Sequence, residues 1–113
     1  MEEYYTYMLR CKDNSIYTGI TNNLSKRMEA HFFQNKKAAK YTKSHGALKV
    51  EIVWKSKSKS LASSLEFHLK KLKKLEKEEI IKGEHLNTYL KGKIDSRRFI
   101  KVNLNGILDE GFM

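Results

Sequence analysis

Two strand-like segments joined by a four-residue polar turn open this chain and constrain its fold more than any other feature. Residues 4–11 (YYTYMLRC) and 16–21 (IYTGIT) are rich in aromatic and β-branched residues, and Lys12-Asp13-Asn14-Ser15 between them is typical of a turn. So short a connection predicts a β-hairpin and an antiparallel sheet. Alternation along the first strand places Tyr5, Tyr7 and Leu9 on one face and the Met8 side chain on the other.

The pattern changes from strand-like to helical after the hairpin. Asn22 and Asn23 are good N-cap residues, and the apolar spacing that follows predicts an amphipathic helix to about Phe33. Residues 34–46 are polar and basic and indicate a surface loop. Residues 47–54 alternate as a third strand, with one face expected to carry Leu48, Val50, Ile52 and Trp54.

A second helix is expected from about Leu61, ending or breaking by Gly83. Its apolar stripe comprises Leu61, Leu65, Leu69, Leu72 and Leu75. Beyond it, Leu86–Leu90 suits a short helix, and RRFIKVNLNGIL suits a strand or an extended arm. The order predicts an α+β fold, a small, mostly antiparallel three-stranded sheet with packed helices (ββαβα) as one layer pair. Residues 1–83 would form the domain, and residues 84–113 a C-terminal extension packed on it or appended to it.

The charge of the chain favours a polyanionic partner. Its 113 residues contain 23 Lys and Arg against 13 Asp and Glu, a formal net charge of +10. An anionic membrane is the weaker alternative, because no apolar run of about 18 residues occurs and the N-terminus does not resemble a signal peptide. We therefore expect a cytoplasmic protein. The lone Cys11 fits a reducing compartment and a packed thiol, and the scattered His residues with one Cys do not suggest zinc.

Two tyrosines of the hairpin stand out as candidate functional residues. Tyr7 and Tyr17 lie on neighbouring strands and would present their phenol oxygens at one place, although both could equally be core aromatics. Gly19, two residues after Tyr17, favours a functional reading, because a strand position without a side chain often marks close approach by a ligand or another backbone.

An ordered series of residues resembles the GIY-YIG nucleases, and within them the small stand-alone proteins that carry a URI-type domain. The first signature is matched by Tyr5-Thr6-Tyr7, where only the last tyrosine is literal, and the second by Tyr17-Thr18-Gly19. The resemblance runs from about Tyr4 to about Ile81, and the series continues with Arg27, His31, Lys40-Tyr41-Thr42 and Glu66. It implies a metal-dependent endonuclease that hydrolyses phosphodiester bonds in DNA.

The resemblance also implies roles for these residues. Tyr7 is the candidate general base and Tyr17 positions the water or the phosphate; a free phenol has a pKa of ~10, so Tyr7 needs nearby cations for that role. Arg27 would hold the scissile phosphate, and His31 would orient a water, take a proton or bind a phosphate oxygen. Glu66 would bind Mg²⁺ or Mn²⁺, or else simply pair with Lys70 on the helix surface.

One position departs from the family pattern. Some members carry an asparagine about a dozen residues after the metal-binding glutamate, and here that neighbourhood is Lys77, Glu78 and Glu79. Lys70, one turn after Glu66, is a plausible substitute. If the asparagine is essential, the chain is a slow enzyme or binds without cutting.

Nucleic-acid contacts are expected from basic residues and from one aromatic ring. The expected contact residues are Gly19, Lys40, Tyr41, Thr42 and Lys70, with further phosphate contacts from Lys36, Lys37, Lys43, Lys71, Lys73, Lys74 and Lys77. Tyr41 would stack on an unpaired base, which favours single-stranded or distorted DNA with little sequence specificity, unless it packs the loop on the core. The alternatives are a catalytically silent nucleic-acid-binding module and an RNA-associated accessory protein. No obligatory protein partner is indicated, and the cellular role stays open between DNA repair, uptake, recombination and a mobile element.

Overall fold

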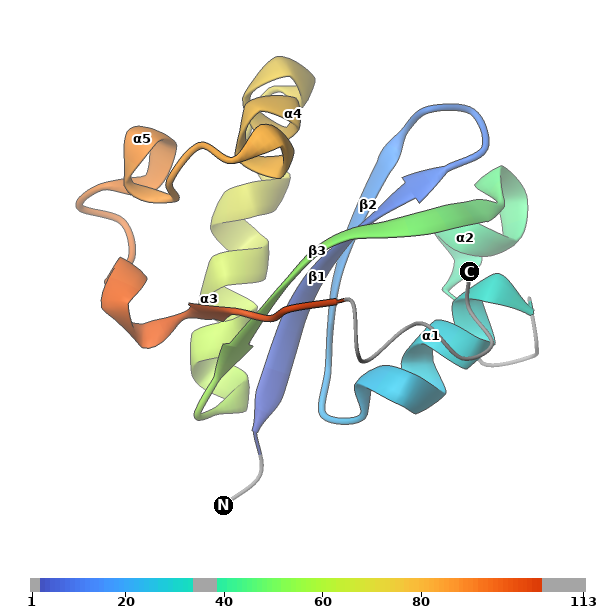
Figure 1. The fold of residues 1–113 in the computed structure, drawn as a ribbon, viewed down its shortest axis with the longest axis horizontal. Helices are drawn as coiled ribbons and strands as arrows, with labels where there is room; N and C mark the ends of the chain where they lie inside the picture. The colour runs from blue at the N-terminus through green and yellow to red at the C-terminus, as the bar shows by residue number, and fades with distance from the viewer. Residues whose placement is uncertain (1–2, 34–38, 105–113) are drawn as a thin grey trace.

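The computed structural model describes residues 3–33 and 39–104, and it begins with the expected hairpin (Figure 1). Strands β1 (Tyr4–Cys11) and β2 (Ile16–Thr21) pair antiparallel, with Tyr7 opposite Gly19. The turn between them contains Asn14 at φ 72°, a left-handed conformation that asparagine tolerates better than most residues. Asp13 supports the turn by accepting a hydrogen bond from the backbone N–H of Ser15.

The α+β class and the antiparallel sheet are confirmed, but the sheet has one more strand than expected. Its order is β2-β1-β3-β4, with β3 (Ala47–Ser56) beside β1 and the short β4 (Ile100–Lys101) at the edge. The additional strand comes from residues that the sequence assigned to an extension. Before it lie helix α5 (Asn87–Leu90), where a short helix was expected, and a single 3₁₀ turn (Ser96–Arg98).

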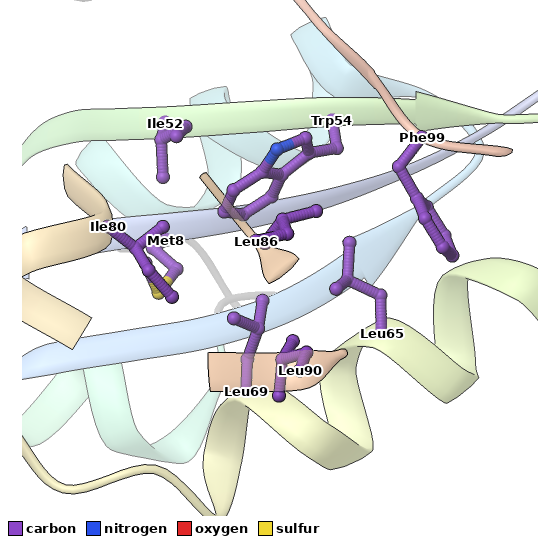
Figure 2. Packing of buried hydrophobic residues seen from close by; sticks show 9 residues of the cluster. All are labelled: Met8, Ile52, Trp54, Leu65, Leu69, Ile80, Leu86, Leu90 and Phe99. Atoms are coloured by element: carbon purple, nitrogen blue, oxygen red, sulfur yellow. The ribbon is translucent and has the colours of Figure 1, made fainter. Parts of the chain in front are cut away.

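Helices cover both faces of this sheet, whereas one layer pair was expected (Figure 1). On one side, α1 (Leu24–Phe32) packs Leu24 and Met28 against Tyr7, Leu9 and Val53. On the other side lie α3 (Lys59–Lys70), α4 (Lys74–Lys82) and α5. Figure 2 shows the core on this second side, which comprises Met8, Ile52, Trp54, Leu65, Leu69, Ile80, Leu86, Leu90 and Phe99. The alternation predicted for β1 is therefore confirmed, because successive residues enter opposite cores.

The predicted alternation of the third strand is wrong. The pairing of β3 with β1 shifts register between Met8 and Leu9 and again between Arg10 and Cys11, as at β-bulges. An extra residue reverses the faces of all residues beyond it. Ile52 consequently enters the core under α3, Val50 packs on the opposite side with Tyr7, and Leu48 is left 54% exposed.

Two helix predictions also need correction. The predicted loop contains a short helix, α2 (Lys40–His45), although residues 34–38 of that loop lie outside the described residues. The predicted helix from Leu61 to Gly83 is interrupted at residues 71–73, where the side chain of Glu76 accepts a hydrogen bond from the backbone N–H of Lys73 and starts α4. The interruption leaves Leu75, the last residue of the predicted stripe, 70% exposed.

A buried arginine ties the sheet to α4. Arg10, 9% exposed on the central strand, donates from Nε to Glu51 at 2.9 Å and from a terminal nitrogen to Glu78 at 2.6 Å. These carboxylates raise the pKa of Arg10, and the Arg10 guanidinium in turn holds the pKa of Glu78 below its usual range. None of the helices in the described part of the chain is both long and apolar enough to cross a membrane.

We predict that Arg10→Ala lowers the free energy of unfolding by about 3 kcal/mol, because removing one partner of a buried ion network leaves the others uncompensated. Urea denaturation followed by circular dichroism measures this loss. The control is Lys49→Ala, whose ammonium lies 3.5 Å from Glu51 on an exposed side chain and should contribute less than about 1 kcal/mol. Equal losses in the two variants would contradict a structural role for Arg10.

Candidate active site

Tyr7 stands at the centre of the candidate site, and Gly19 makes room for it. The Tyr7 side chain is fully buried on β1, directly across from Gly19 on β2. A Cβ atom at Gly19 would lie 2.5 Å from the Tyr7 hydroxyl oxygen, closer than unbonded atoms approach. The sequence predicted that a ligand or another backbone approaches Gly19, whereas the group that lies there is the Tyr7 phenol.

Helix α1 brings Arg27 and His31 to the Tyr7 hydroxyl. Asn23 caps this helix by accepting from the backbone N–H of Lys26, which sets the start from which the two residues follow one turn apart. The Tyr7 hydroxyl lies 2.8 Å from Nε2 of His31, and Arg27 donates from Nε to the same oxygen at 3.4 Å. Three of the five candidate catalytic residues therefore meet at one oxygen atom.

This environment shifts the protonation of both Tyr7 and His31. Burial raises the pKa of Tyr7 well above its usual value, and the negative charge of Glu66 adds to that rise. Burial, together with the positive charge of Arg27, lowers the pKa of His31 to about 4. Near neutral pH the pair is therefore a neutral phenol beside a neutral imidazole.

Thr42 lies on the far side of the His31 ring and is fully buried. Its hydroxyl oxygen is 2.8 Å from Nδ1 of His31 and donates to the backbone carbonyl of Ala39 at 3.0 Å. The Thr42 hydroxyl thus contacts His31, and its expected contact with nucleic acid stays a prediction. Sequence reasoning missed this role, because it treated residues 34–46 as a surface loop.

Aromatic rings line the edge of the site. The Tyr17 ring lies 6.3 Å from Tyr7 and 5.4 Å from His31, measured between centroids. Tyr41 stacks on Tyr17 at 5.6 Å and on His45 at 4.0 Å, and Nδ1 of His45 hydrogen-bonds with the Asp13 carboxylate in the hairpin turn. Tyr41 is partly buried, so it contributes to both the packing of α2 and the surface of the site.

Glu66 approaches the cluster from α3. Its side chain is 23% exposed and forms an ion pair with Lys70 at 3.2 Å, while its charge acts on Tyr7. Lys70 also lies near Lys77. Burial lowers the pKa of Lys77, and the positive charge of Lys70 lowers it further. Lys40 and Lys70 are exposed, as a phosphate contact requires.

The donor atoms near Glu66 limit what kind of metal site is possible. Within residues 3–33 and 39–104, no three His, Cys, Asp or Glu side chains are grouped to hold a metal ion. A single partly buried carboxylate still fits Mg²⁺ or Mn²⁺, since Mg²⁺ commonly binds through one or two carboxylates and completes its shell with waters and substrate phosphate oxygens.

Tyr7, Arg27 and His31 meet at one point of a small α+β domain, an arrangement that suits a catalytic site. Residues 3–79 match the family described as the GIY-YIG catalytic domain, and the chain belongs to this family. The resemblance inferred from the sequence is thereby confirmed.

Several bacterial proteins are similar to this chain over about 70% of its length. UPF0213 protein FN1575 of Fusobacterium nucleatum is 53% identical over 78 residues, which cover 69% of this chain and 76% of that protein. UPF0213 protein OB0043 of Oceanobacillus iheyensis is 44% identical over 71% of this chain and 91% of its own length. The solution NMR structure of UPF0213 protein BH0048 from Bacillus halodurans is 33% identical and covers 80% of this chain and 97% of that chain, with a TM-score of 0.47.

The buried, neutral His31 should make stability depend on pH. Its pKa is about 4 in the folded chain against about 6.5 for an unperturbed histidine, so the unfolded chain binds more protons between these values. The free energy of unfolding should therefore fall as the pH drops from 6.5 towards 4, with this group contributing at most about 1.4 kcal/mol per pH unit. Urea titrations at several pH values should show a shallower fall for His31→Phe. Parallel curves for the two proteins would exclude His31 as the source.

Proposed function

We propose that this chain is a metal-dependent endonuclease that hydrolyses phosphodiester bonds in DNA with little sequence specificity. Five residues would act on one phosphodiester: Tyr7, Tyr17, Arg27, His31 and Glu66. The observation that carries the proposal is the meeting of Arg27 and His31 at the Tyr7 hydroxyl, with Glu66 near enough to change the Tyr7 pKa. Membership of a nuclease family and the net charge of +10 support it.

In the proposed reaction, Tyr7 passes a proton from the attacking water to His31. As the water oxygen bonds to phosphorus, its proton moves to the Tyr7 hydroxyl oxygen, and the Tyr7 proton moves to Nε2 of His31. The bond from phosphorus to the leaving oxygen breaks, and that oxygen takes a proton from solvent. A relay suits the site better than a pre-formed phenolate, because burial keeps Tyr7 protonated at neutral pH.

Arg27 and Tyr17 would arrange the substrate around this relay. The Arg27 guanidinium is charged at every relevant pH and is held at the Tyr7 oxygen, so it is placed to stabilise charge on the phosphate as the water attacks. The Tyr17 ring, beside both Tyr7 and His31, would position the water or the phosphate.

Glu66 would hold the divalent cation, Mg²⁺ or Mn²⁺. When bound, such a cation withdraws charge from the phosphate oxygens and lowers the pKa of water. Lys70 now pairs with the Glu66 carboxylate, so cation binding would require this ammonium to move aside, and its four-carbon stem would let it reach a phosphate instead.

The exposed lysines around the site would grip the DNA backbone regardless of base sequence. Lys40 and Lys43 lie on α2, and Lys70, Lys71 and Lys74 lie at the junction of α3 and α4; all are exposed. Lys36 and Lys37 lie outside the described residues. The expected preference for single-stranded or distorted DNA rests on Tyr41 at the edge of the site, and a base would stack there in competition with Tyr17 or His45.

The first test is Glu66→Gln, assayed on labelled single-stranded DNA, duplex DNA and RNA with and without Mg²⁺ or Mn²⁺. The amide keeps the shape of the side chain but not the charge that would hold the cation, so we expect loss of cation-dependent cleavage with DNA affinity nearly unchanged. Glu29→Gln makes the same change at an exposed position on α1 and should cleave normally. A wild-type protein that binds DNA and never cuts it would favour the silent binding module.

The second test is Tyr41→Ala, with affinity measured in the Glu66→Gln background. If the ring stacks on an unpaired base, the substitution should weaken binding of single-stranded DNA by ~1–3 kcal/mol and affect duplex much less. Tyr89→Ala removes another partly exposed aromatic ring, on α5, and should leave both affinities unchanged. Equal losses on the two substrates in Tyr41→Ala would make Tyr41 a packing residue.

A further inference from the structure

The hydrogen bonds through Tyr7 and His31 form one chain that starts at Arg27 and ends at the backbone of Ala39. Its four links are Arg27 Nε to Tyr7 at 3.4 Å, Tyr7 to His31 Nε2 at 2.8 Å, His31 Nδ1 to Thr42 at 2.8 Å, and Thr42 to the Ala39 carbonyl at 3.0 Å. Tyr7, His31 and Thr42 are each 0% exposed. Each hydroxyl group and the neutral imidazole in this buried chain carries one mobile proton. The hydrogen bonds therefore have a defined donor-to-acceptor direction.

Both ends of the chain have a fixed polarity. The Arg27 guanidinium can only donate, and the Ala39 carbonyl can only accept. Thr42 donates its single hydroxyl proton to the Ala39 carbonyl, so Thr42 Oγ1 acts as a hydrogen-bond acceptor toward His31. His31 then carries its proton on Nδ1, and Nε2 accepts the proton of the Tyr7 hydroxyl. Every link donates in the same sense, away from Arg27.

We propose that Thr42 is a positioning residue that, together with the Ala39 carbonyl, fixes His31 in the tautomer with the proton on Nδ1. The opposite tautomer would place a proton on Nε2, pointing at Tyr7, and neither His31 nor Arg27 at the Tyr7 hydroxyl would then accept the Tyr7 proton. The catalytic consequence rests on the proposed nuclease function, whereas the tautomer itself does not.

The surrounding structure explains how α2 holds Thr42 in place. The Ala39 carbonyl also accepts from the backbone N–H of Lys43, and the Gly46 N–H bonds to the carbonyl of Thr42, so one turn of helix fixes both ends of the link. Stacking of Tyr41 on Tyr17 and the contact of His45 with Asp13 in the hairpin turn hold this helix against the site. A helix of only six residues therefore presents one side chain to His31 with a defined direction.

The direct test is the tautomer of His31 in the full-length protein, read at neutral pH from the ring nitrogen shifts of ¹⁵N-histidine by long-range ¹H–¹⁵N correlation, with the signals assigned through His31→Gln. We expect a protonated Nδ1 and an unprotonated Nε2 in the wild type and in Thr42→Ser, which keeps the hydroxyl. Thr42→Val keeps the shape and removes the acceptor, so the Nε2-protonated form should become populated. A wild-type His31 protonated on Nε2 would overturn the proposal, whether or not the valine variant folds.

The catalytic arm compares the same variants on a DNA that the wild type cleaves. Thr42→Val should lower kcat at least about tenfold at unchanged KM, and Thr42→Ser should restore it. Ser44→Ala removes a comparable hydroxyl on α2, which bonds to the Lys40 carbonyl and not to His31, and should leave both the tautomer and kcat unchanged. A changed tautomer with unchanged kcat would overturn the catalytic role of Thr42. A wild type without cleavage would instead refute the nuclease proposal and leave the tautomer result standing.

Discussion

Burial of β1 on both faces is the constraint on which the rest of the structure depends. Because its side chains alternate, Met8 enters the core under α3 while Tyr7 and Leu9 enter the core under α1. Both helix layers are thereby fixed relative to one strand. Glu66 can approach Tyr7 from α3 while Arg27 and His31 reach it from α1, because the two helices are packed on opposite faces of the same strand (Figure 1).

Local patterns predicted the parts of the fold that depend on neighbours in sequence. The hairpin, the capped helix after Asn23 and the two faces of β1 all follow from periodicity and turn chemistry. The faces of β3 could not be predicted, since a bulge depends on how one strand pairs with another and leaves no composition signal. The interruption at residues 71–73 was missed because apolar residues at helical spacing continue through it. One of these residues, Leu75, is exposed and does not pack in the core.

In the candidate site, too, local spacing predicted some features and tertiary contacts determine the others. Spacing alone predicted that Arg27 and His31 lie one turn apart and that Tyr7 and Tyr17 are on adjacent strands, and the structure brings Arg27 and His31 to the Tyr7 hydroxyl. The contact of Thr42 with His31 depends on a short helix inside a segment without clear periodicity. The sequence indicated only that some group approaches Gly19 closely. The strand register identifies that group as Tyr7, which lies opposite Gly19.

The residues about a dozen positions after Glu66, where some family members carry an asparagine, make other interactions in this chain. Glu78 is committed to Arg10, which anchors α4 on the sheet and so fixes the preceding residue, Lys77, near Lys70. Two neighbouring ammonium groups repel each other, and an anion between them relieves that repulsion. Lys70, which pairs with Glu66, therefore stays the predicted substitute for the neutral amide, while the Arg10 network fixes the position of the helix that carries Lys77.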